Sequence, residues 1–235
     1  MSSGRADVQA GKSLKLKEKK IRGGKAKSIL KRESLDDFVR GAVAKCKRNG
    51  YALIRQMDDI VRGRFDLRTE KDVNTIAEAL RTQPKYPVSS IVRPQREQKG
   101  GGFGYPRWHV ILKDPETDLT HEWQVGTQAV TDVFETEGIV LPPGVKLGPG
   151  MKNNLHDIEY DIFRGIQKKY PDVHKRHGLP EFHNKVDQVA AEAGLKGSET
   201  PDLEKKIKEL HEGAAMHLQK LVDEFGADWL KQFYH

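Results

Sequence analysis

The chain has 235 residues, of which 32% are charged and 36% hydrophobic, and it carries a formal net charge of +7. This length allows one sizeable domain with additional helices, or two small domains. No apolar run approaches the roughly 20 residues that cross a bilayer, and the first residues lack a signal-peptide core, so we expect a soluble protein without a membrane partner. The single cysteine, Cys46, excludes an internal disulfide and a cysteine-based zinc site.

The positive charge is concentrated near the N-terminus. Residues 1–32 hold eleven lysines and arginines against Asp7 and Glu18, so this stretch carries +9 and the rest of the chain −2. Residues 1–20 lack hydrophobic periodicity, which predicts a disordered basic leader. Such a basic stretch is typical of a solvated tail, of an arm that binds nucleic acid or of part of a polyphosphate site.

Helices and strands are predicted to alternate after the leader. The expected order is a helix over 34–48, strands around 53–54 and 60–65, a helix over 69–83 and a strand over 88–92. Thr69, with Asp72 three residues later, is the expected N-cap of the second helix.

Two further strands, joined by the polar turn 113–120, follow a glycine-rich loop at 100–104. If alternate residues of each strand share a face, Arg107, His109 and Ile111 lie opposite Trp108, Val110 and Leu112; Glu122 and Gln124 lie together, opposite Trp123 and Val125. A histidine and a carboxylate could therefore meet at one sheet surface. An ordinary hairpin with a solvated polar face is the alternative.

The remaining residues are predicted to be mainly helical. A helix is expected to about residue 135, then a proline- and glycine-rich loop over 138–150 and a helix over 154–169. The histidines at 174, 177 and 183 are interpreted as scattered surface residues of a loop that contains Pro171, Gly178 and Pro180. Helices over 185–193 and from residue 200 onward complete a C-terminal extension.

Four segments stand in the order found in RelA/SpoT-type (p)ppGpp synthetases, and this combination resembles that family. The basic stretch 22–31 resembles its ATP-phosphate helix, and DIVRGR at 59–64 its magnesium-binding aspartate and following arginine. Gly104-Tyr105 with His109 resembles its Gly-Tyr-x-x-x-His, and EWQVGT at 122–127 its Glu-x-Gln-Ile-Arg-Thr. Enzymes of this family transfer pyrophosphate from ATP to a nucleotide 3′-hydroxyl.

The resemblance implies an α/β (α+β) fold over residues 21–170, namely a nucleotidyltransferase-like mixed sheet of about five strands flanked by helices, with a helical C-terminal extension over 171–235. It implies Mg²⁺ as cofactor, ATP as donor and a purine nucleotide as acceptor. The residues it assigns are Glu122, Asp59 and His109 for catalysis; Arg22, Lys25, Lys27, Ser28, Lys31 and Arg64 for ATP; Tyr105, His109 and Gln124 for the acceptor; and Asp59 and Glu122 for the metal, with Glu122 also as base.

The sequence departs from the family at Gly126, where the family has arginine, and in the approach 99–105. These changes touch the acceptor and phosphate sides, so GDP or GTP, an adenine nucleotide and an RNA 3′ end all stay open as acceptors. The alternative of another class is a basic RNA-binding module. With no hydrolase or regulatory signature, a regulated synthetase and a growth-inhibiting toxin are both open. A toxin would act in the cytoplasm, be delivered from another cell as an effector, and have an immunity or antitoxin protein as partner.

Overall fold

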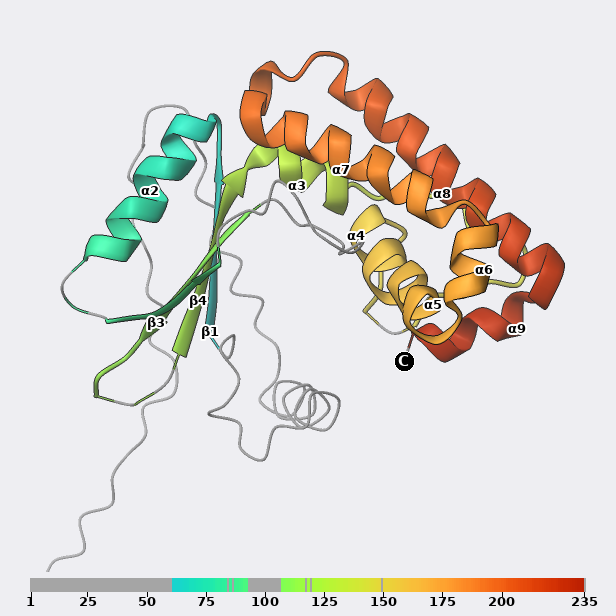
Figure 1. Cartoon of the computed structure of the whole chain (residues 1–235). Helices are drawn as coiled ribbons and strands as arrows, with labels where there is room; N and C mark the ends of the chain where they lie inside the picture. The colour runs from blue at the N-terminus through green and yellow to red at the C-terminus, as the bar shows by residue number, and fades with distance from the viewer. Residues whose placement is uncertain are drawn as a thin grey trace, which may run out of the picture.

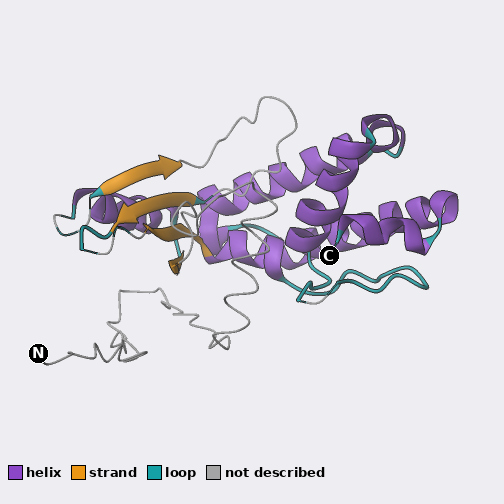
Figure 2. Cartoon of the chain, turned by 90° about the horizontal axis from the view of Figure 1, so that it is seen from below, coloured by secondary structure: helices purple, strands orange, loops and turns teal. Residues whose placement is uncertain are grey.

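The structure is a computed structural model that describes residues 61–83, 85, 87–92, 107–116, 118, 120–148 and 150–234. These residues form a mixed sheet with a covering helix, followed by a larger helical part (Figure 1). Seen from below, the strands gather at one end of the molecule and most helices at the other (Figure 2). The predicted fold class, a mixed sheet with helices and a C-terminal helical extension, is confirmed.

The sheet has the strand order β1-β4-β3-β2. Its strands are β1 (Val61–Leu67), β2 (Val88–Val92), β3 (Trp108–Lys113) and β4 (Thr120–Thr127). β1 runs parallel to β4, whereas β3 is antiparallel to both β2 and β4. The predicted hairpin is therefore confirmed as β3–β4, and the described part of the chain supplies four of the roughly five predicted strands.

Helix α2 (Glu70–Thr82) covers the apolar face of the sheet. Its N-cap is Thr69, whose side chain accepts a hydrogen bond from the backbone N–H of Asp72, as the sequence predicts. The buried centre of this contact consists of Leu67, Val73 and Val125, and the residues packed around it are Phe65, Ile76, Leu80 and Trp108. Because α2 covers this face, the alternate residues of β1, β3 and β4 point to the other one.

The larger core lies in the helical part. Its elements are α3 (Gln128–Glu135), α4 (Leu155–Asp157), the π-helix η2 (Ile158–Phe163), α5 (Arg164–Lys169), α6 (Pro171–Arg176), α7 (Leu179–Lys196), η3 (Gly197–Glu199), α8 (Leu203–Phe225), α9 (Ala227–Leu230) and η4 (Lys231–Phe233). Val130, Ile162, Val186 and Leu218, from α3, η2, α7 and α8, are fully buried in one cluster. Helices on both sides of residue 170 therefore share a core. None of the helices that the structure describes is long and apolar enough to span a membrane.

The expected loop around the histidines of residues 174–183 is wrong. Pro171 and Pro180 lie in the first turns of α6 and α7, where a missing backbone N–H has no helical partner to lose. The expectation of surface histidines is also wrong for His174 and His183, which are buried on these helices. Proline here marks the start of a helix and not a loop.

The helical part is docked on the ends of β1 and β4. The side chain of Thr127, at the end of β4, donates a hydrogen bond to the carbonyl of Ala193 at 2.9 Å. The backbone N–H of Ser198 donates to the carbonyl of Arg68 at 3.1 Å, just beyond β1. Gly197 makes this approach possible, because a Cβ there would lie 2.0 Å from that carbonyl oxygen. These contacts hold α3, which follows β4 directly, beside the ends of β1 and β4.

Candidate active site

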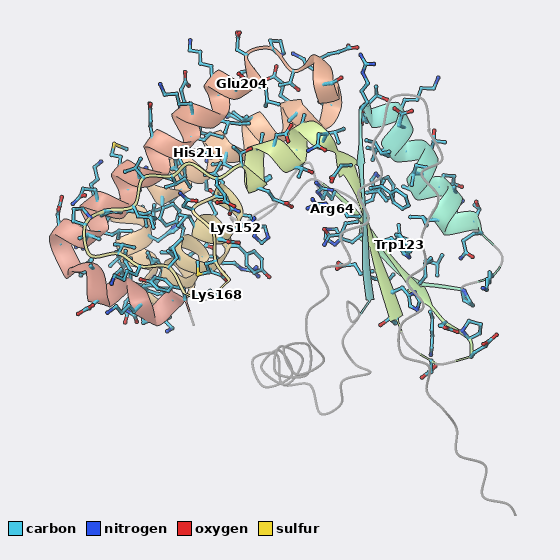
Figure 3. The ribbon with its side chains drawn as sticks, turned by 180° about the vertical axis from the view of Figure 1, so that it is seen from behind. Arg64, Trp123, Lys152, Lys168, Glu204 and His211 are labelled. Carbon is cyan, nitrogen blue, oxygen red and sulfur yellow. The ribbon has the colours of Figure 1, made fainter. Side chains whose placement is uncertain are left out.

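Three neighbouring strands place polar side chains in a row on the face away from α2. Gln124 of β4 is in register with Arg64 of β1 on one side and with His109 of β3 on the other. Glu122, two residues earlier on β4, shares this face, while Trp123 lies on the opposite one. Figure 3 shows Arg64 and Trp123 on opposite sides of the sheet. The alternation predicted from the sequence is confirmed by this register.

Glu122 is held by its two polar neighbours. Nδ1 of His109 lies 2.7 Å from Oε1 of Glu122, and Nε2 of Gln124 donates to Oε2 of Glu122 at 3.4 Å. The side chains of His109 and Glu122 keep 23% and 12% of their surface exposed. The carboxylate is therefore oriented but still reachable, which is what a proton acceptor or a metal ligand requires.

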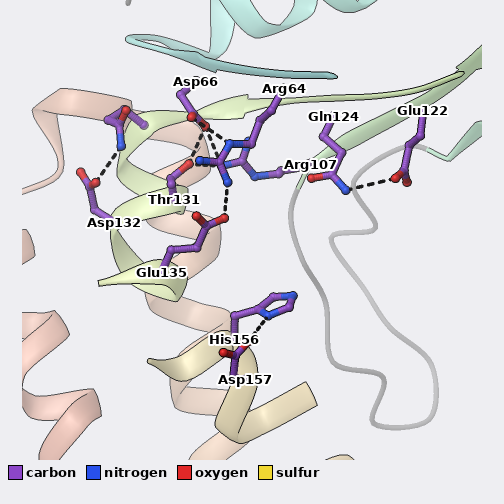
Figure 4. A network of polar contacts seen from close by, with 11 residues as sticks. Arg64, Asp66, Arg107, Glu122, Gln124, Thr131, Asp132, Glu135, His156 and Asp157 are labelled. Atoms are coloured by element: carbon purple, nitrogen blue, oxygen red, sulfur yellow. Dashed lines mark hydrogen bonds and ion pairs between the residues drawn. The ribbon is translucent and has the colours of Figure 1, made fainter. Parts of the chain in front are cut away.

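A second polar network begins at Arg64 and extends to α3 (Figure 4). Nε of Arg64 lies 3.0 Å from Oδ2 of Asp66, and Nη1 of Arg64 contacts Glu135. Nη2 of Arg107 lies 2.8 Å from Oδ1 of Asp66 and also contacts Oγ1 of Thr131, whose hydroxyl donates to Asp66 at 2.6 Å. Two guanidinium groups and two carboxylates thus contact one another at the end of the sheet.

A pocket of about 210 Å³ opens over this network, at the carboxyl ends of the parallel strands β1 and β4. Ligands of open α/β sheets commonly bind at that end. The volume is below the 300 Å³ or so that small-molecule sites start from, so the pocket suits one group of a larger ligand. The lining residues are Arg64, Asp66, Gln128, Thr131, Asp132, Glu135 and Thr136.

The structure brings four of the sequence-predicted site residues together: Arg64, His109, Glu122 and Gln124. The other seven, Arg22, Lys25, Lys27, Ser28, Lys31, Asp59 and Tyr105, lie outside the described residues.

The sequence interpretation assigned no site role to Asp66, Arg107, Thr131 and Glu135. Alternation from Arg64 could have found Asp66, and the i, i+4 spacing of Thr131 and Glu135 places both on one face of α3. Arg107 was placed on the correct face, but nothing in the local pattern signals that its guanidinium is buried.

A larger hollow, of about 410 Å³, lies between α6 and α8 and contains none of the predicted site residues. Its lining includes His177 and Glu224, which face each other at 2.8 Å, and Arg176, which also contacts Glu224. Because His177 and Arg176 both contact Glu224, these side chains are already engaged with one another.

Comparisons with known proteins found similarity among solved structures only. No model of a protein family matches the chain, and no curated protein matches it. The small alarmone synthetase 1 from Bacillus subtilis bound to its product pppGpp is 18% identical, with a TM-score of 0.39 over 72% of this chain and 75% of that chain. The same enzyme in another structure is 15% identical (TM-score 0.44; 73% and 76%), as is a GTP pyrophosphokinase family protein from Streptococcus pneumoniae (TM-score 0.42; 82% and 77%). These proteins are of the class that the four sequence motifs resemble.

Proposed function

We propose that this protein transfers the β,γ-pyrophosphoryl group of ATP to the 3′-hydroxyl of a nucleotide. The observation that carries the proposal is the row of Arg64, Gln124 and His109 across three strands, with Glu122 beside it on the same face. Such a transfer needs cations for the triphosphate, a base for the attacking hydroxyl and groups that orient the acceptor. Arg64, Glu122 and Gln124 are the proposed groups of these three kinds.

Glu122 is the proposed base. The acceptor's 3′-oxygen forms a bond to the β-phosphorus of ATP, the bond from that phosphorus to the α–β bridging oxygen breaks, and AMP leaves. The proton of the hydroxyl passes to the carboxylate of Glu122. His109, 2.7 Å from this carboxylate, orients it, and Gln124 binds the acceptor.

Arg64 is the proposed phosphate-binding cation of the sheet. Its Nη1 contacts Glu135, and its Nε lies next to Asp66. Bound triphosphate would take the place of Glu135 at the outer nitrogen, while the pair with Asp66 keeps the side chain in position. Arg22, Lys25, Lys27, Ser28 and Lys31 are proposed from the motif to bind the same phosphates, and Tyr105 to stack on the acceptor base.

Magnesium is the proposed cofactor, and the donor chemistry of Glu122 fits it. Mg²⁺ prefers oxygen ligands and is commonly held by one or two carboxylates together with substrate phosphates and water. Within the described ranges no three His, Cys, Asp or Glu side chains gather into a metal site. A site completed by the substrate therefore suits Glu122, with Asp59 as the second proposed protein ligand. The bound ion would offset charge on the phosphates.

The test uses ATP labelled in its γ-phosphate, magnesium and each acceptor in turn: GDP, GTP, AMP, ADP, ATP and deacylated tRNA. The expected result is release of AMP in equal amount to one labelled product. Release of ADP and phosphate would indicate simple ATP hydrolysis, and no consumption of ATP with any acceptor would contradict the proposal.

For the biological role we propose a growth-inhibiting toxin that acts in the cytoplasm, with a small synthetase under regulated expression as the alternative. Induced expression of the wild type in a bacterium is expected to stop growth, and expression of Glu122→Gln at the same level is not. Sustained growth with active wild-type protein would exclude the toxin.

A further inference from the structure

Arg107 is a buried cation on the polar face. Only 1% of the residue is exposed, and it precedes β3 directly. Its guanidinium reaches Asp66 at 2.8 Å and contacts Thr131 on α3. Burying a charge is costly unless it is paired, so this position is set by its partners and not by solvation.

Gly126 provides the space for this side chain. A Cβ added at Gly126 would lie 2.7 Å from Cγ and 3.3 Å from Cζ of Arg107, closer than side-chain atoms normally approach. The backbone gives no separate reason for a glycine there, because Gly126 is not among the glycines with positive φ. Glycine at this strand position is thus explained by the guanidinium side chain that lies over it.

Asp66 connects the two arginines. It is in register with Gly126, and its two oxygens face Arg107 at 2.8 Å and Arg64 at 3.0 Å. If Arg107 lost its charge, Arg64 would be left between two carboxylates, Asp66 and Glu135. Its guanidinium would then be held more tightly by the protein and attract an anion less.

We propose that Arg107 is a positioning residue whose guanidinium side chain fills the space over Gly126, beside Asp66. It neutralises Asp66 across the strand, and so leaves Arg64 able to bind the triphosphate. The second part of this inference rests on the proposed function; the first part, that positions 107 and 126 are exchangeable as the source of the cation beside Asp66, does not.

The exchange is tested by moving the arginine. Gly126→Arg alone introduces a clash, and Arg107→Gly alone removes the buried guanidinium that contacts both Asp66 and Thr131. Each single variant is expected to lower Tm by about 4 °C or more. The variant with both substitutions is expected to recover most of the loss, because a guanidinium again lies beside Asp66. Losses that simply add in the double variant would overturn the proposal. This outcome does not depend on activity.

The effect on Arg64 is tested with ATP and magnesium by titration calorimetry. Arg107→Met keeps the buried volume but removes the charge, and it should weaken ATP binding about tenfold. In an Asp66→Asn background the same substitution should change the ATP Kd less than about threefold, because the carboxylate that Arg107 neutralises is already absent. Arg81→Met, at an exposed site on α2, is the matched control and should change nothing. Equal losses in both backgrounds would overturn the role of Asp66.

The two experiments separate the inference from the proposed function. If the wild type binds ATP but transfers nothing, the proposed function fails and both measurements still decide the role of Arg107. If the wild type binds no ATP, the proposed function and the effect on Arg64 fail together, and the Tm comparison decides the exchange.

Discussion

Nδ1 of His109 lies 2.7 Å from Oε1 of Glu122, although the two residues are diagonal and not opposite each other in the sheet. Directly opposite Glu122 stands Ile111, and directly opposite His109 stands Gln124. Diagonal neighbours on antiparallel strands are farther apart than direct pairs, and only long side chains bridge them. The contact therefore joins His109 to a carboxylate that is not its direct partner in the sheet.

The role of Glu122 as base predicts the effect of Glu122→Gln. The amide has nearly the same shape but cannot accept the proton and is a poor ligand for magnesium, so transfer should fall by about a hundredfold or more. The fold should be unchanged, as checked by Tm. Glu116→Gln, in the exposed turn of the hairpin, is the control and should keep wild-type kcat. Full activity of Glu122→Gln would contradict the mechanism.

The contact between the two side chains predicts that their substitutions are not additive. His109→Asn should lower kcat, because the carboxylate loses the partner that orients it. When Glu122 is already glutamine, the same substitution should cost much less, since the group it orients no longer takes a proton. The measurement is kcat for the four proteins of the cycle. Two independent losses that multiply would mean that His109 acts without Glu122.

Arg64 should affect ATP more than the acceptor. Arg64→Met removes the cation that lies in register with Gln124 and lines the pocket at the strand ends. The KM for ATP should rise about tenfold, while the KM for the acceptor should change little. Arg81→Met serves again as the control of equal chemistry. An equal rise of both Michaelis constants would place Arg64 between the two substrates and not on ATP alone.

The fold was predictable where local chemistry decides it. Thr69 as a cap, the alternation in β3 and β4 and the apolar stripes of the later helices all follow from neighbours in the sequence. Local sequence does not predict the start of α7 at Leu179, because Pro180 is compatible with a loop and also with the first turn of a helix. Burial of the neighbouring His183 depends on α7 packing against η2, which no local pattern reveals.

The candidate site, too, is predictable only where neighbours in the sequence decide it. Alternation along two strands placed His109 and Glu122 on one face, because a strand with one covered face fixes the direction of every side chain. The contact of Arg107 with Asp66 joins residues 41 positions apart and depends on the register of β1 beside β4. Parallel pairing of two distant strands is decided by tertiary packing and not by local sequence. The network around Asp66 and Arg107 therefore cannot be predicted from the sequence.

The basic leader distinguishes the two classes of function. Removing residues 1–20 takes away six of the eleven cations of residues 1–32. If the protein is a synthetase, transfer to a mononucleotide should stay within about twofold of the full chain, because none of the proposed site residues is removed. If it is an RNA-binding module, RNA affinity and its salt dependence should both fall strongly. Transfer rate and RNA affinity at two salt concentrations decide between them.

A buried carboxyl group in the helical part gives the protein a pH-dependent stability. Glu159, on η2, is 2% exposed, with His183 3.4 Å from its Oε1. Asp187 faces the other side of the same imidazole at 3.3 Å. Burial raises the pKa of Glu159 to about 7, and the nearby His183 only partly opposes this shift. Between about pH 4.5 and pH 7, the native state therefore keeps a proton on Glu159 that the unfolded chain has released.

The raised pKa of Glu159 gives the free energy of unfolding a pH-dependent contribution on the order of 3 kcal/mol. This contribution is complete below about pH 4.5 and is lost as the pH rises to about 7 and above. Glu159→Gln carries no charge at any pH, so its free energy of unfolding should match the wild type near pH 5 and exceed it at pH 8. Urea unfolding of both proteins at each pH measures this difference. Burial lowers the pKa values of His174, His211 and His217, which has the opposite effect on stability. That effect is the same in both proteins, so it cancels in the difference. Glu212→Gln, at an exposed position of α8, should show no such trend. A constant difference between Glu159→Gln and the wild type from pH 5 to pH 8 would mean that Glu159 is ionised in the native protein throughout.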